Sequence, residues 1–158
     1  MTEKKDIVEA AMSIAYKSHT GMTDKYGNPY FEHLDRVAGR VRDMEYDMVD
    51  ETSEINLYIA AAYLHDVIED TDYSMKELTA NFGEVVADAV KLLSREKEMT
   101  YADYVERIKN SLFLEGKIAR VVKLADLFDH LMGPTPCPAR LVKRYEKSLY
   151  SLISKGVK

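Results

Sequence analysis

The sequence predicts an all-α protein, a single helical bundle of about seven to nine helices that spans residues 1–158. Apolar residues recur at the 3.6-residue spacing of an α-helix along most of the chain, and Gly and Pro residues separate these stretches. No stretch alternates polar and apolar residues as a half-buried strand does. The chain is long enough for one domain with a hydrophobic core and too short for two ordinary domains.

Three helices are expected in the first half of the chain. The first ends near Gly21, because a glycine commonly follows the last helical turn. A loop with the turn signal Gly27-Asn28-Pro29 separates it from the second. The third is expected to continue through the polar segment Leu64–Thr71. The apolar positions place these helices at residues 7–19, at residues 31–44, and from residue 55 onward.

The second half of the chain carries clearer helix boundaries. Ser74 followed by Glu77 is a capping-box pattern, in which the two side chains bond to each other's backbone N–H groups. Thr100 is a second expected N-cap, and Gly133-Pro134 is an expected helix stop. The expected helices are a short one after Ser74, then residues 85–93, 101–108, 118–131 and 140–154.

Composition excludes several classes of protein. The net charge of −5 argues against binding a nucleic-acid polymer. Cys137 is the single cysteine, which excludes an intrachain disulfide or a thiolate metal cage. No apolar run approaches the roughly 20 residues of a membrane span, and the N-terminus lacks a signal-peptide pattern. The expectation is a cytoplasmic protein with no membrane contact, and homo-oligomer formation is left open.

The segment Leu64–Thr71 places one imidazole and three carboxylates in an otherwise apolar helical run. Burying unpaired charge is costly, so a helix packed in a core has no reason to carry four titratable side chains. On a continuous helix, residues four apart share a face, which would place His65 over Glu69 and Asp66 over Asp70. A bound metal ion accounts for such a polar strip, and the sequence therefore predicts a metal site.

A second apolar helix repeats this pattern. Asp126 and His130 lie four residues apart, on the same face of the expected helix 118–131. A histidine alone is usually an ordinary core or surface residue. Two apolar helices that each carry an acid and an imidazole indicate instead that they meet at one polar centre.

These residues resemble the HD-domain metal phosphohydrolases, and more narrowly the hydrolase domain of RelA/SpoT-type alarmone enzymes. The resemblance rests on the order His33…His65-Asp66…Asp126 and covers about residues 5–152. The segments that carry it are Ala15–His19, Gly27–His33, Leu64–Thr71, Asn81–Val86 and Val122–Asp126. The chain stops where the long enzymes continue into a nucleotide-synthesising domain, so it resembles the single-domain small alarmone hydrolases.

The resemblance implies a role for each motif residue. His33, His65, Asp66 and Asp126 would hold a divalent metal, usually Mn²⁺, and Glu69 and Asp70 would orient or deprotonate the attacking water. This mixed nitrogen and oxygen ligand set also suits Fe²⁺, Co²⁺ or Ni²⁺. The implied substrate is guanosine 3′,5′-bis(diphosphate), ppGpp, or its pentaphosphate, pppGpp, cut at the 3′ position to release pyrophosphate. The residues expected at the nucleotide are Lys25, His130, Arg140, Arg144 and Tyr145.

Two of the departures from the family pattern bear on how the nucleotide is bound. Asp24 stands where an arginine is usual, and His130 stands where an asparagine is usual. Both changes bear on guanine recognition and leave the metal ligands intact. Three functions therefore stay open: a manganese-dependent ppGpp and pppGpp 3′-pyrophosphohydrolase, an HD phosphohydrolase of another phosphorylated nucleotide such as the 2′-phosphate of NADPH, and a non-catalytic nucleotide-binding regulatory module.

Overall fold

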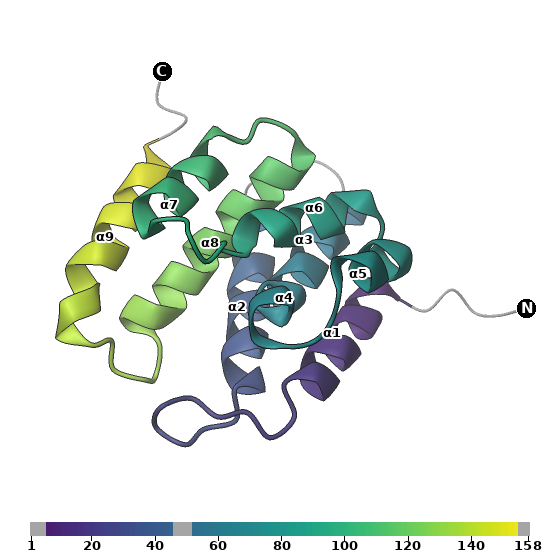
Figure 1. Cartoon of the computed structure of the whole chain (residues 1–158), viewed down its shortest axis with the longest axis horizontal. Coiled ribbons are helices and arrows are strands. Elements are labelled where there is room, and N and C mark those ends of the chain that lie inside the picture. Colours follow the sequence, from purple (N-terminus) through teal and green to yellow (C-terminus); the bar gives the residue numbers. More distant parts are fainter. Residues whose placement is uncertain (1–5, 46–51, 155–158) are drawn as a thin grey trace, which may run out of the picture.

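The computed structural model describes residues 6–45 and 52–154, and these residues form the helices α1–α9 with no strand among them. The all-α prediction is confirmed. In order, the helices are α1 (Ile7–Ser18), α2 (Phe31–Glu45), α3 (Thr52–Leu64), α4 (Val67–Asp70), α5 (Met75–Phe82), α6 (Glu84–Leu93), α7 (Tyr101–Asn110), α8 (Leu114–Met132) and α9 (Ala139–Ile153). Figure 1 shows them gathered into one bundle. None of the described helices is both long and apolar enough to cross a bilayer.

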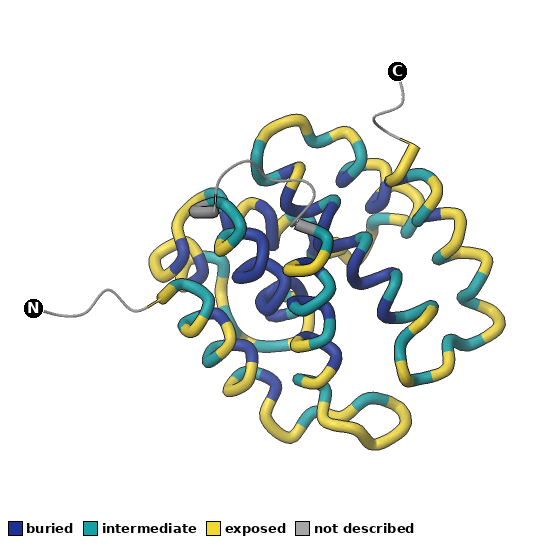
Figure 2. The backbone as a smooth tube through the Cα atoms, turned by 180° about the vertical axis from the view of Figure 1, so that it is seen from behind, coloured by how far each residue is buried: buried dark blue, intermediate teal, exposed yellow. Residues whose placement is uncertain are grey.

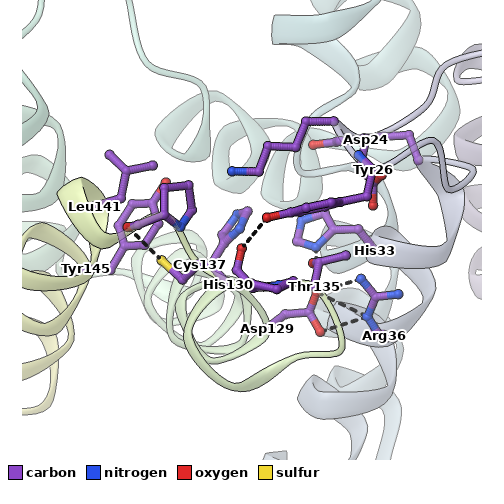
Figure 3. A pocket seen from close by; sticks show the side chains of 14 residues that line it. Asp24, Tyr26, His33, Arg36, Asp129, His130, Thr135, Cys137, Leu141 and Tyr145 are labelled. Atoms are coloured by element: carbon purple, nitrogen blue, oxygen red, sulfur yellow. Dashed lines mark hydrogen bonds and ion pairs between the residues drawn. The ribbon is translucent and has the colours of Figure 1, made fainter.

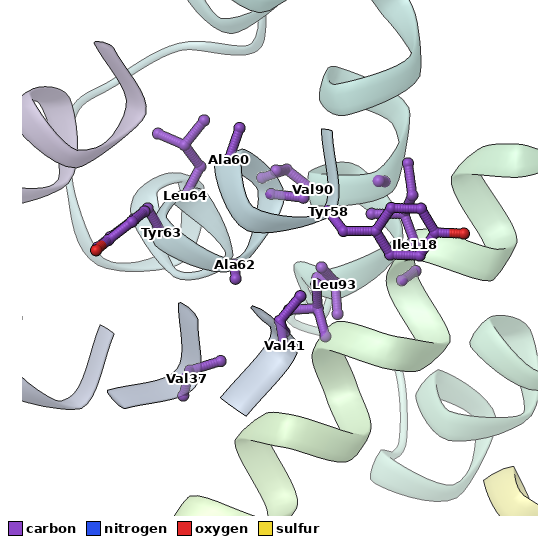
Figure 4. Packing of buried hydrophobic residues seen from close by; sticks show 14 of the residues in the cluster. Val37, Val41, Tyr58, Ala60, Ala62, Tyr63, Leu64, Val90, Leu93 and Ile118 are labelled. Atoms are coloured by element: carbon purple, nitrogen blue, oxygen red, sulfur yellow. The ribbon is translucent and has the colours of Figure 1, made fainter. Parts of the chain in front are cut away.

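The helix α3 lies at the centre of the bundle. It packs against α1, α2, α6 and α8, and Tyr58–Leu64 are buried without interruption. A helix that is apolar on all sides has to be surrounded in this way. Figure 4 shows its side chains meeting Val37 and Val41 of α2, Val90 and Leu93 of α6, and Ile118 of α8. The buried backbone in Figure 2 follows the same central elements.

Most expected boundaries agree with the structure. Ser74 and Glu77 form the capping box at the start of α5, and the Thr100 side chain accepts a hydrogen bond from Asp103 N at the start of α7. The helix expected at residues 118–131 begins earlier, at Leu114, and its first turn packs closely against the end of the preceding loop at Ser111. An added Cβ on Gly116 would lie 2.4 Å from the Ser111 backbone oxygen, so only glycine fits there.

The prediction that one helix runs through Leu64–Thr71 is wrong. The helix α3 ends at Leu64, and α4 begins at Val67 after a turn at His65-Asp66. Consecutive residues on a helix point in different directions. The break lets both side chains face one point, with 3.1 Å between His65 Nε2 and Asp66 Oδ2.

Candidate metal centre

The four predicted metal ligands come together from three parts of the fold. His33 lies in the first turn of α2, His65 and Asp66 form the turn between α3 and α4, and Asp126 lies in the middle of α8. Asp126 Oδ1 is 3.2 Å from His33 Nε2 and 3.6 Å from His65 Nε2, and Asp66 Oδ2 is 4.0 Å from His33 Nε2. Packing of α2 and α3 against α8 brings these residues together, although up to 93 positions separate them.

Both histidines present an unpaired nitrogen to this cluster. The Nδ1 of His65 bonds to the Ala62 backbone oxygen at 2.6 Å, and the Nδ1 of His33 bonds to Asp129 Oδ2 at 2.8 Å. The Nε2 atoms of both rings are buried and have no hydrogen-bond partner of good geometry. Metal-binding histidines are oriented in this way, with one nitrogen held by the protein and the other left for the ion.

Asp129, which the sequence analysis did not single out, positions His33. Its side chain is 2% exposed and also accepts a hydrogen bond from Arg36 Nε at 2.9 Å and one from Arg40 Nε at 3.3 Å. The sequence signal for it is present, because Asp129 follows Asp126 by three residues on the same apolar helix. What the spacing does not reveal is that this face of α8 meets α2.

The two predicted ligand carboxylates also accept hydrogen bonds from neighbouring side chains. Lys123, buried one turn before Asp126, donates to Asp126 Oδ2 at 2.9 Å and leaves Oδ1 facing the histidines. The Tyr30 hydroxyl donates to Asp66 Oδ2 at 2.5 Å. Burial, together with the charge of Asp66, raises the pKa of Tyr30, which keeps this hydroxyl protonated as a donor. These hydrogen bonds orient the carboxylates of both Asp66 and Asp126.

The buried carboxylates and the neighbouring imidazoles and lysine shift one another's pKa values toward their charged forms. Burial on its own would lower the pKa of His33, but Asp126 and Asp129 raise it to about 9. Burial opposes ionisation of Asp126 too, yet Lys123 and the surrounding imidazoles hold its pKa well below the usual range. A divalent cation supplies such positive charge without protons on the rings. The donor set therefore fits a divalent metal ion.

Glu69 and Asp70, the predicted catalytic pair, lie at the end of α4, just beyond the cluster. Partial burial raises the pKa of both carboxyls, and the negative charge of Asp66 raises it further. Glu69 Oε1 accepts a hydrogen bond from Arg95 N, which opposes the shift. Asp70 faces the buried His19, with 3.9 Å between His19 Nε2 and Asp70 Oδ2. Both are titratable groups with pKa values moved toward neutrality.

A cavity of about 270 Å³ opens beside the cluster (Figure 3). The loop before α2 and the proline-rich loop before α9 border it, joined by a hydrogen bond from the Tyr26 hydroxyl to the Pro136 oxygen at 3.2 Å. Three predicted substrate residues, Lys25, His130 and Tyr145, line this cavity. His33, Arg36 and Asp129 line it too, so the cavity reaches the histidine–aspartate cluster.

Arg140 and Arg144 are not among the residues that line this cavity. Arg140 is exposed at the start of α9. The Arg144 guanidinium stacks on the Tyr101 ring, 4.1 Å from its centroid, and lines a separate groove between α7 and α9. Their assignment to the substrate stays a prediction that the position of the cavity does not support.

Asp24 has a structural role in the cavity wall. Its Oδ1 accepts hydrogen bonds from the backbone N–H groups of Tyr26 at 2.8 Å and Asn28 at 3.0 Å, and its Oδ2 accepts one from the Asn28 side chain at 3.2 Å. These bonds form a compact turn in the loop before α2. The carboxylate thus shapes the loop and places negative charge beside the cavity.

The fold and the cluster define a helical protein with a buried histidine–aspartate centre. Residues 11–117 match the family model described as HD domain, and the chain belongs to the HD domain family. Asp126, Asp129 and His130 lie beyond the matched residues.

Two relatives are named as enzymes of guanosine nucleotides. A protein of Synechocystis sp., named probable guanosine-3′,5′-bis(diphosphate) 3′-pyrophosphohydrolase, is 31% identical over 150 residues, 89% of this chain and 19% of that protein. A GTP pyrophosphokinase of Streptomyces coelicolor is 30% identical over 124 residues, 75% of this chain and 14% of that protein. The chain thus spans no more than about a fifth of the length of these relatives.

A solved structure shares the fold. It is described as a metazoan ortholog of SpoT that hydrolyzes ppGpp. It matches with a TM-score of 0.69 at 23% identity and covers 98% of this chain and 88% of that chain.

Proposed function

We propose that this protein is a metal-dependent phosphohydrolase that removes pyrophosphate from the 3′ position of ppGpp and pppGpp. The observation that carries the proposal is the pair of buried Nε2 atoms of His33 and His65, both without hydrogen-bond partners and both directed at the carboxylates of Asp66 and Asp126. The names of the relatives and of the structural neighbour support the choice of substrate.

The proposed centre divides the work among residues already described. His33, His65, Asp66 and Asp126 hold the metal, with Mn²⁺ as the proposed ion. A divalent ion in this position lowers the pKa of a bound water and neutralises charge on a phosphate. Glu69 and Asp70 orient the attacking water and accept its proton, a task for which a raised carboxyl pKa is suited. The exposed Lys25 offers a cation to the phosphates at the rim of the cavity.

A second candidate substrate is another phosphorylated nucleotide, such as one with a 2′-phosphate. The observation that favours it is the carboxylate of Asp24 beside the cavity, where the resemblance expects an arginine. An arginine at this position could stack on a purine and offset phosphate charge, whereas a carboxylate does neither, so the contact expected for guanosine is missing. The metal chemistry would be the same for both substrates, so only the group held in the cavity differs.

One assay separates these functions. The purified chain, stripped of metal and reloaded with Mn²⁺, is incubated with ppGpp, pppGpp, NADPH and GTP, and the products are identified by ³¹P NMR. Pyrophosphate released together with GDP or GTP from the first two substrates supports the proposal. Inorganic phosphate released from NADPH supports the second candidate. Turnover of none of the four, by protein that has bound Mn²⁺, would contradict both.

A matched variant tests whether the centre is responsible. His65→Ala removes one imidazole whose Nδ1 contacts only a backbone oxygen, so the neighbouring ligands keep their own supports. We expect it to lose both tightly bound metal and turnover. Lys76→Ala, at an exposed position of α5, is the control for handling.

A further inference from the structure

His130 lies in the last turn of α8, directly against the metal cluster. Its Nε2 is 3.1 Å from Asp126 Oδ1, the same oxygen that lies 3.2 Å from His33 Nε2 and 3.6 Å from His65 Nε2. Three imidazole nitrogens from three parts of the fold therefore surround one carboxylate oxygen. Ligand atoms of His33, Asp126 and His130 also lie within 4.8 Å of one another, as one shared ion requires.

The separation between His130 and Asp126 suits two neighbouring ligands of one six-coordinate ion. With metal–ligand bonds of about 2.1–2.3 Å, neighbouring ligand atoms lie about 3.0–3.3 Å apart and opposite ones about 4.2–4.6 Å apart. The contact between Asp126 Oδ1 and His130 Nε2, at 3.1 Å, has the spacing of neighbouring ligands. Asp126 Oδ2 is held by Lys123, so Oδ1 is the oxygen of this carboxylate that faces the ion.

The His130 ring is also held in place by its surroundings. Its centroid is 4.9 Å from that of His33 and 5.3 Å from that of Tyr145. The side chain is 42% exposed, so its other edge borders the cavity. The nitrogen that points inward is the one next to Asp126, which is the position of a ligand rather than of a group that binds only substrate.

We propose that His130 is a metal ligand, so that the centre consists of three histidines and two aspartates. This inference rests on the proposed metal centre and adds a fifth residue to it. A six-coordinate ion then keeps one position open instead of two. A third imidazole favours Co²⁺, Ni²⁺ or Zn²⁺ more than Mn²⁺, since Mn²⁺ prefers oxygen ligands.

Two variants separate coordination from packing. His130→Phe keeps an aromatic ring between His33 and Tyr145 but has no nitrogen, and His130→Asn introduces a short amide. Metal-free wild type and variants are titrated with Co²⁺ and, separately, with Mn²⁺ in competition with a chromophoric chelator. The visible absorption of the Co²⁺-loaded proteins is recorded, and circular dichroism checks that each variant is folded.

Removing a supporting partner of a metal ligand commonly weakens affinity 10–100-fold, so removing a ligand should weaken it at least about tenfold. We expect that loss for Co²⁺ in both variants, a smaller loss for Mn²⁺, and a changed Co²⁺ spectrum. Tyr145→Phe, which changes the other neighbour of the His130 ring, should bind Co²⁺ as the wild type does.

Two results would overturn the inference, and they have different meanings. If folded His130→Phe binds Co²⁺ with wild-type affinity and spectrum, His130 is not a ligand, while the four-residue centre stands. If the wild type itself binds neither Co²⁺ nor Mn²⁺, the metal centre fails and the role of His130 fails with it.

Discussion

Replacing Asp129 by Asn tests whether the hydrogen bond that orients His33 contributes to stability and to metal binding. Asp129 receives hydrogen bonds from His33 Nδ1 at 2.8 Å, from Arg36 Nε at 2.9 Å and from Arg40 Nε at 3.3 Å. Asn keeps the size of the side chain but loses its charge and one of its two acceptors. The Nδ1–H of His33 or a guanidinium then faces an amide N–H₂ group, so the ring of His33 is free to turn.

The size of the effect follows from burial. A hydrogen bond to a charged group contributes about 1.5–3 kcal/mol when it is buried. Only the contact with His33 is fully buried, because the Arg36 and Arg40 side chains are 28% and 32% exposed and regain water when released. We therefore expect a loss of about 2–3 kcal/mol in the free energy of unfolding, and not the sum over all contacts. For a domain of this size that lowers Tm by about 4–12 °C.

Metal affinity should fall together with stability. Loss of a partner that orients a ligand commonly weakens metal binding by about 10–100-fold, and we expect that range for Asp129→Asn. Chelator competition measures the affinity, and urea unfolding of the metal-free protein measures the stability. Asp88→Asn, the same change on an exposed position of α6, is the matched control. If Asp129→Asn binds metal as tightly as the control does, His33 is not oriented by Asp129.

Three further predictions follow from the structure. Glu69→Gln and Asp70→Asn should keep the metal and lose about 10²–10⁴-fold in kcat, the range of a positioned acid–base group, and full activity in both would refute the proposed role. Asp24→Asn removes the negative charge beside the cavity but keeps an oxygen that accepts the hydrogen bonds of the loop. In steady-state kinetics KM for ppGpp should therefore fall while kcat is unchanged. An unchanged KM would refute this effect of charge. Hydrogen bonds from Ser74 hold the pKa of Glu77 below its usual value. The stability that the ionised Glu77 contributes is therefore present above about pH 4.5 and is lost as the pH falls. Glu77→Ala should lower Tm more at pH 7 than at pH 3, and equal losses at both pH values would count against this linkage.

The helices were predictable because their signals are local. Apolar periodicity located all the long helices, and the capping box of Ser74 and Glu77 marked the start of α5 within one turn. The break at His65-Asp66 was not predictable in the same way. Local propensity favours a continuous helix there, whereas in the fold the helix breaks and both side chains reach one centre.

The residues that orient the predicted ligands could be predicted from the sequence only in part. Lys123, Asp126 and Asp129 follow one another at three-residue spacing, so one face of α8 could be recognised as polar from the sequence. That spacing does not say which helix this face meets. Asp129 is distinct from an ordinary surface carboxylate only because α2 crosses α8 at His33, 96 positions earlier in the chain. The same argument applies to His130: the sequence places it over Asp126, but only the approach of α2 and of the turn after α3 makes it the third imidazole around a single oxygen.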